Sequence, residues 1–107
     1  MSTMKRERAM GQLKKYRVFV NGTNLLLRID GVLGRYGFYT TRYVEAPNGT
    51  SAAEKALTLI REELQDMVLN ELTDKPSLDV EETQHLVSFG DAIVPGQGFS
   101  LYEEKPH

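Results

Sequence analysis

The chain has 107 residues, 40% of them hydrophobic and 26% charged, a composition typical of one globular domain. It contains no cysteine, which excludes disulfides, thiolate catalysis and zinc sites built on cysteine. No run of about 20 apolar residues occurs, and no apolar stretch of signal-peptide length follows the basic N-terminus. We therefore expect a cytoplasmic protein.

Charge is distributed unevenly along the chain, although the net charge is only -2. Residues 1–17 contain six basic side chains and one acidic side chain, whereas the remaining ninety residues contain seven basic and fourteen acidic ones. A basic head on an acidic body indicates either a solvated tail or an arm that contacts an anionic partner. We interpret residues 1–14 as a basic flexible leader and residues 15–107 as a single α+β domain.

Residues 16–30 predict the first two strands of an antiparallel meander. β-Branched and aromatic residues dominate positions 16–20, and Asn21-Gly22 follows at once. This dipeptide predicts a hairpin, because both residues tolerate the positive φ of a tight turn. Residues 25–30 are then the returning strand, with one apolar face formed by Leu25, Leu27 and Ile29.

Residues 38–46 predict the third strand, after a turn in the glycine-rich segment 31–37. Two faces alternate along this strand, and we expect the one that carries Phe38 and Val44 to be buried. On that face Arg42 should lie near a sheet end, with its guanidinium group reaching water.

The second half of the chain predicts a helix and one or two further strands. Ser51 and Glu54 have the spacing of a capping box, and an apolar stripe at intervals of three and four continues toward Glu71. Residues 77–81 alternate as a half-buried strand, and residues 98–102 form a last short one. The stripe consists of Ala53, Ala56, Leu57, Ile60, Leu64, Met67 and Val68.

These elements predict a two-layer α+β fold with the helix packed on one face of the sheet. A helix of this length returns the chain along the sheet, and it delivers the fourth strand parallel to the third. If the fourth strand lies beside the first, the sheet order is 3-2-1-4.

Aromatic and basic side chains interleave at residues 35–43, a composition found on sheet surfaces that stack nucleic-acid bases. Arg35, Thr40 and Arg42 form the candidate anion-binding set in this segment. Aromatic residues in strands also form ordinary packing or interface surfaces. The candidate interface is the sheet face opposite the helix, with Leu26, Tyr39, Thr41 and Tyr43.

Motifs for catalysis or cofactor binding are absent: no nucleophile elbow, P-loop or dinucleotide fingerprint occurs. Glu82 and His85, with Asp79 and Glu81 nearby, make a poor metal-binding set. Alternate residues of a strand, such as Asp79 and Glu81, normally lie on its solvent-exposed face. We predict no catalytic, metal-binding or cofactor-binding residues, and the sequence favours a non-enzymatic protein.

The function that we expect is a protein-interaction module that self-associates, most simply as a homodimer. One helix covers only one face of the sheet, and an uncovered apolar face usually marks an interface. The alternative is a nucleic-acid or anion-binding domain that uses the basic N-terminal head and the strand at residues 35–43. No membrane partner is expected.

Overall fold

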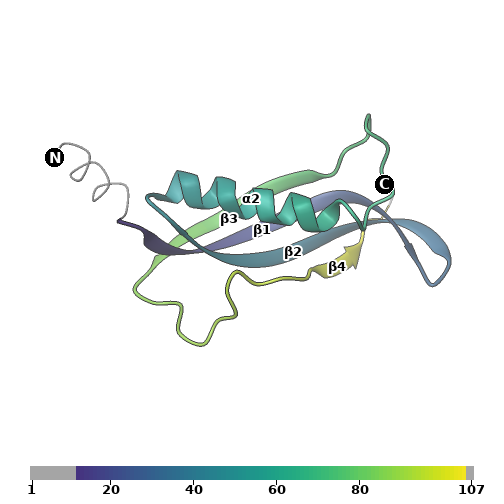
Figure 1. Ribbon diagram of the computed structural model, residues 1–107. Helices are drawn as coiled ribbons and strands as arrows, with labels where there is room; N and C mark the ends of the chain where they lie inside the picture. The colour runs from purple at the N-terminus through teal and green to yellow at the C-terminus, as the bar shows by residue number, and fades with distance from the viewer. Residues whose placement is uncertain (1–11, 106–107) are drawn as a thin grey trace.

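The computed structural model describes residues 12–105, which form an antiparallel sheet of four strands and one α-helix (Figure 1). The strands lie in the order β3-β1-β2-β4, and each neighbouring pair is antiparallel. This confirms the expected α+β class. The elements in chain order are β1 (Lys14–Ile29), β2 (Val32–Ala46), α2 (Gly49–Leu64), β3 (Ser77–Leu86) and β4 (Ser100–Glu103).

The predicted leader falls largely outside this description. Residues 1–11 lie outside the described residues, and Lys14, which we assigned to the leader, begins β1. Across residues 12–105, no helix combines the length and the apolar character needed to cross a membrane.

The predicted hairpin at Asn21-Gly22 is wrong, because β1 runs straight through this dipeptide. Gly22 serves close packing instead: a Cβ atom there would lie 1.9 Å from Cε2 of Phe38 on the neighbouring strand. The turn is made by Asp30 and Gly31, whose φ angles are 52° and 80°. Two successive positive φ angles are the signature of a type I′ hairpin. The predicted order 3-2-1-4 is therefore wrong, since it counted β1 as two strands.

The predicted turn at residues 31–37 is also largely wrong, because β2 already begins at Val32. The choice of its buried face is correct, since Phe38 and Val44 are both buried. Arg42 lies on the same face, but the expectation that its guanidinium reaches water is wrong. The residue is only 1% exposed.

The helix α2 begins and ends earlier than its sequence pattern predicts. Asn48 is the N-cap, and its side chain accepts a hydrogen bond of 2.8 Å from the backbone N–H of Ser51. An asparagine cap satisfies a free amide of the first turn, so Ser51 lies inside the helix rather than at its cap. The helix ends at Leu64 instead of near Glu71, and the backbone N–H of Leu69 bonds to the carbonyl oxygen of Leu26 in β1.

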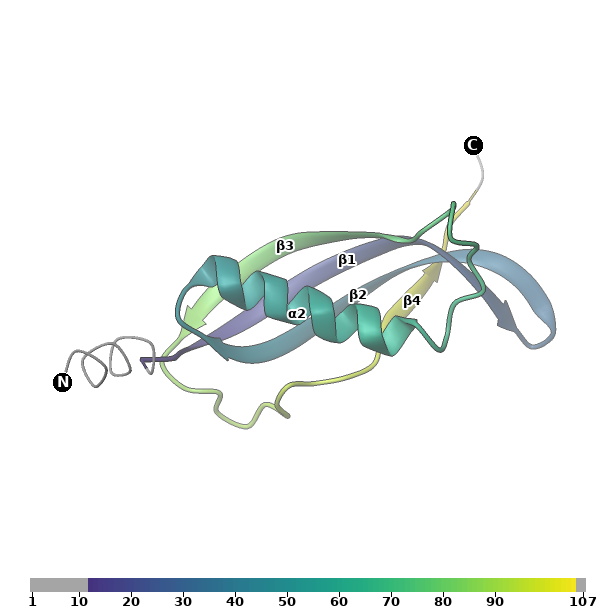
Figure 2. The ribbon, with the colours of Figure 1, turned by 45° about the horizontal axis from the view of Figure 1, so that its top comes forward.

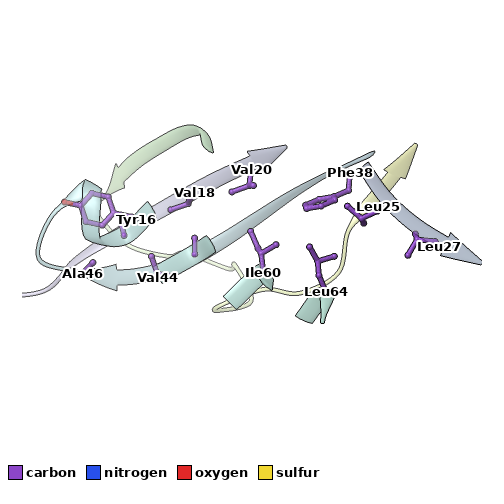
Figure 3. Packing of buried hydrophobic residues seen from close by; sticks show 12 residues of the cluster. Tyr16, Val18, Val20, Leu25, Leu27, Phe38, Val44, Ala46, Ile60 and Leu64 are labelled. Atoms are coloured by element: carbon purple, nitrogen blue, oxygen red, sulfur yellow. The ribbon is translucent and has the colours of Figure 1, made fainter. Parts of the chain in front are cut away.

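One hydrophobic core joins α2 to the sheet, and the helix lies across one sheet face (Figure 2). The helix contributes a buried residue at every fourth position, which keeps these side chains on one side. Figure 3 shows Ile60 and Leu64 packed among side chains of β1 and β2. The core consists of Tyr16, Val18, Val20, Leu25, Leu27, Phe38, Val44, Ala46, Ala52, Ala56, Ile60 and Leu64.

The last two strands occupy opposite sides of the central hairpin. β3 is longer than the predicted strand at residues 77–81, and it pairs with β1 with Val80 opposite Val20. β4 is shorter than predicted and pairs with the middle of β2, with Ser100 opposite Tyr39. Hence β1 and β2 are the central strands, and the 87–99 segment connects the two outer ones.

Candidate functional site

The sheet face opposite α2, which we call the outer face, carries a row of three aromatic rings. Because side chains alternate along a strand, the residues between the buried positions of β1 and β2 point to this face. Phe19 of β1 and Tyr39 of β2 stack with ring centroids 5.6 Å apart and planes only 5° from parallel. Tyr102 of β4 continues the row, 5.6 Å from Tyr39. We call Phe19, Tyr39 and Tyr102 the aromatic ladder.

Polar contacts fix the end of the ladder at Tyr102. Its hydroxyl oxygen accepts a hydrogen bond of 3.1 Å from Nδ2 of Asn21, which also donates to the carbonyl oxygen of Phe38. Its ring lies over Gly37, where a Cβ atom would come within 2.2 Å. Tyr39 and Tyr102 nevertheless remain 44% and 37% exposed, so the ladder is held in place and still open to contact.

Two basic residues of β1, Arg17 and Lys15, lie on the outer face, and each has an acidic neighbour. The Arg17 guanidinium lies 5.7 Å from the Phe19 ring centroid, and its Nη1 is 2.9 Å from Oε1 of Glu82. Lys15 lies 4.0 Å from a carboxylate oxygen of Glu45. Both pairs are substantially exposed and contribute little to stability, but they leave this part of the outer face close to neutral.

A groove of about 530 Å³ opens beside the ladder. Its floor is the outer face of β2, and its far wall is the segment at residues 92–99 that leads into β4. The backbone N–H of Tyr43 donates to the carbonyl oxygen of Pro95 at 2.8 Å, which ties this segment to the edge of β2. The lining residues are Phe19, Tyr39, Thr40, Thr41, Tyr43, Ala92, Ile93, Gly96, Gln97, Gly98, Phe99 and Ser100.

The segment at residues 92–99 is also fixed from the helix side by an ion pair, which we call the Arg42–Glu63 clamp. Nη2 of Arg42 lies 2.6 Å from Oε2 of Glu63. The other carboxylate oxygen of Glu63 accepts a hydrogen bond of 2.8 Å from the backbone N–H of Gly98. The Arg42 guanidinium also lies 5.3 Å from the Phe99 ring centroid. The clamp thus connects β2, α2 and the wall of the groove.

Arg42 has further partners within its own strand. Its Nη1 donates to the hydroxyl oxygen of Thr40 and, at 2.9 Å, to the carbonyl oxygen of Thr41. The Thr40 hydroxyl in turn donates to the carbonyl oxygen of Gly98 at 2.7 Å. These contacts satisfy a cation that would be costly to bury alone.

Arg35 belongs to a separate polar network near Gly22 and Leu25 of β1, between which the pairing with β2 shifts register. Its Nη1 donates to Oδ1 of Asn24 at 2.6 Å and to a carboxylate oxygen of Asp74 at 2.8 Å. Asn24, with φ of 63°, also donates from Nδ2 to Asp74. The hydrogen bonds from Asn24 and Arg35 hold the pKa of Asp74 below its usual value. This network attaches the segment after α2 to the sheet.

The structure does not bring the three candidate anion-binding residues together. Thr40 and Arg42 lie on the buried face of β2 and bond to each other, whereas Arg35 is exposed and bonded to Asp74. By strand alternation, Arg35 lies on the other side of the sheet from Arg42. Each of the two guanidinium groups already has a carboxylate partner.

The candidate interface residues lie on the outer face at two places. Tyr39, Thr41 and Tyr43 line the groove, and Tyr43 meets Phe89 edge to face at 6.1 Å. Leu26 is partly buried farther along the sheet, opposite Arg35. Sequence reasoning missed Phe19, although its position between the buried Val18 and Val20 was a usable signal.

The acidic residues of β3 have no metal-site geometry. Glu82 pairs with Arg17 on the outer face, whereas the ring of His85 lies 5.4 Å from that of Tyr16 on the core side. Within residues 12–105, no group of three or more histidine and acidic side chains is arranged to hold a metal ion.

Comparison with known proteins gives no relative: no protein-family model, no curated protein and no solved structure matches this chain.

Proposed function

We propose that this protein is a non-enzymatic interaction module whose molecules associate with each other through the outer face. The observation that carries the proposal is the aromatic ladder, which stands on the sheet face that α2 leaves uncovered. Tyrosine and phenylalanine are favoured anchors of protein interfaces, because they bury a large area at a small cost in side-chain entropy. Two such faces stack as in a β-sandwich.

The size of the outer face is compatible with a stable contact. A standard interface buries about 800 Å² on each partner. The molecule measures 59 by 31 Å along its two longest axes, so a contact over about half of this outline would bury an area of that order. Ile93, beside the groove, is 80% exposed and adds apolar surface next to the ladder.

Association by strand pairing at the free edge of β3 is less favourable than association through the outer face. Its pairing with β1 is irregular between Phe19 and Val20, and Glu81 and Glu82 stand at that point. Bulges and charged side chains on an outer strand disfavour the addition of another strand.

The alternative function, binding of nucleic acid or another polyanion, has weaker support. The rings of Phe19 and Tyr39 cover one face of each other, which leaves less ring surface for stacked bases. Arg17 and Lys15, two cations on the outer face of β1, both have carboxylate neighbours. A single-stranded RNA oligonucleotide added at low salt should therefore leave the mobility of the protein unchanged.

Sedimentation equilibrium between about 5 and 500 μM tests the proposed self-association. The weight-average mass of the wild type should rise with concentration, whereas Tyr39→Asp should stay monomeric, because it places a charge in a desolvated contact. Leu72→Asp is the matched control: Leu72 is 87% exposed, lies outside the groove, and should associate like the wild type. A wild type that is monomeric throughout, or equal effects of the two variants, would refute the proposal.

A further inference from the structure

A second groove, of about 450 Å³, lies on the helix side of the molecule. One wall is the C-terminal half of α2, and the other is the segment at residues 75–78, where β3 begins. Its volume is within the range of small-molecule sites, roughly 300 to 1,000 Å³. The lining residues are Thr58, Arg61, Glu62, Leu64, Gln65, Val68, Lys75, Pro76 and Leu78.

The apolar part of this groove continues the hydrophobic core. Leu64 belongs to the core and is 4% exposed, whereas Val68 and Leu78 are partly buried and pack against it. A ligand that covers Val68 and Leu78 would remove further apolar surface from water, which is favourable in proportion to the area. The groove therefore suits an alkyl chain.

Each wall of the groove also carries a cation. Arg61 stands in the last turn of α2, and Lys75 precedes Pro76 on the opposite wall. In the described part of the chain, neither side chain has a carboxylate within 4.0 Å, in contrast to Arg17, Arg35 and Arg42.

The charge of the groove is unusual for this protein. Glu62 lines the groove beside the two cations. The net charge of the groove lining is therefore +1, whereas the net charge of the whole chain is -2. Two cations that form no ion pair within residues 12–105, beside an apolar floor, are complementary to one kind of small molecule. That molecule has a single anionic head and an unbranched apolar tail.

We propose that this second groove binds a monomeric medium-chain alkyl carboxylate. The tail lies along Leu64, Val68 and Leu78, and the carboxylate lies between Arg61 and Lys75. The site is separate from the aromatic ladder, and its occupancy does not depend on self-association through the outer face.

Titration with sodium decanoate, below the concentration at which it forms micelles, tests the site in the full-length protein. Methyl NMR signals of Leu64, Val68 and Leu78 should shift and saturate at one ligand per chain. Octanoate, which is two methylenes shorter, should bind roughly 10-fold more weakly if both lost methylenes are buried. Absence of saturable shifts at these methyl groups would overturn the proposal.

A test of the two cations distinguishes this site from a surface that binds decanoate through apolar contact alone. The double variant Arg61→Gln/Lys75→Gln should raise the Kd for decanoate roughly 10-fold, since it removes both charge-assisted contacts. The matched control, Lys14→Gln/Arg28→Gln, removes two exposed cations outside the groove and should leave the Kd unchanged. Equal effects of the two double variants would overturn the proposal.

Two further ligands test whether the groove requires an anionic head group and whether that head group belongs to a free carboxylate or to a membrane lipid. Decyltrimethylammonium has the same tail with a cationic head, and it should bind at least about 10-fold more weakly than decanoate. Equal affinity would show that only apolar burial matters and would overturn the proposal. Anionic phospholipid vesicles that capture the protein, when free decanoate does not bind, would also overturn it and assign the groove to a membrane lipid.

Discussion

Removal of the Glu63 carboxylate should destabilise the protein, because it breaks the Arg42–Glu63 clamp. In Glu63→Ala, Arg42 loses the carboxylate that it pairs with, and its side chain is only 1% exposed in the wild type. Breaking a fully buried ion pair costs about 3 to 5 kcal/mol. The Glu63 side chain is 32% exposed, so water replaces part of the lost contact, and we expect about 2 to 3 kcal/mol.

A change of this size is measurable by thermal unfolding followed by circular dichroism. For a chain of 107 residues, about 2 to 3 kcal/mol lowers the Tm by roughly 10 °C. Glu62→Ala is the control, because Glu62 is exposed and forms no ion pair among residues 12–105, and its Tm should change little. A Glu63→Ala variant that melts with the wild type would refute the claim that the clamp stabilises the fold.

The clamp also predicts a local effect that global stability does not report. The backbone N–H of Gly98 donates to Glu63, so hydrogen exchange at Gly98 should become faster in Glu63→Ala even well below the Tm. The groove wall should loosen with it. Unchanged exchange at Gly98 would show that other contacts hold this segment.

Three further predictions concern the core, the N-terminal segment and pH. Ile60→Ala should cost about 2 to 5 kcal/mol in urea unfolding, because Ile60 is completely buried, and an unchanged midpoint would place it outside the core. Deletion of residues 1–11 should leave the Tm within error of the full chain, since the core formed by residues 12–105 begins at Tyr16, and a large loss would make this segment part of the domain. The lowered pKa of Asp74 stabilises the fold above about pH 4, and this contribution is lost as the pH falls. Asp74→Asn should therefore be destabilised at pH 7 but differ less from the wild type at pH 3, and an equal difference at both values would contradict this.

Local patterns predicted the existence of most elements but not how they join. Asn21-Gly22 and Asp30-Gly31 are both good hairpin dipeptides, and only the second forms a turn. The difference lies in Phe38, whose ring occupies the space beside Gly22. A contact between residues 16 positions apart leaves no trace in a local pattern.

The end of the helix shows the same limit. The apolar stripe continues through Met67 and Val68, so helical periodicity alone extends the helix past Leu64. The helix ends at Leu64, and a few residues later Leu69 and Asn70 bond to Leu26 at the edge of β1, a tertiary contact that overrides local propensity.

The candidate site was partly predictable for a related reason. Alternation along β2 places Tyr39 and Tyr43 on one face, and the same rule applied to β1 adds Phe19. Tyr102 joins the ladder only through the pairing of β4 with β2, which no local signal indicates. The burial of Arg42 likewise depends on Glu63, which follows it by 21 positions in the sequence.

Isotope-filtered NMR on a mixture of labelled and unlabelled protein tests the central proposal, self-association through the outer face, most directly. At several hundred micromolar, intermolecular NOEs should connect the rings of Phe19, Tyr39 and Tyr102 in one molecule with the same surface of another. They should vanish in Tyr39→Asp. Intermolecular NOEs confined to other surfaces, or none in a sample of monomeric mass, would contradict the account.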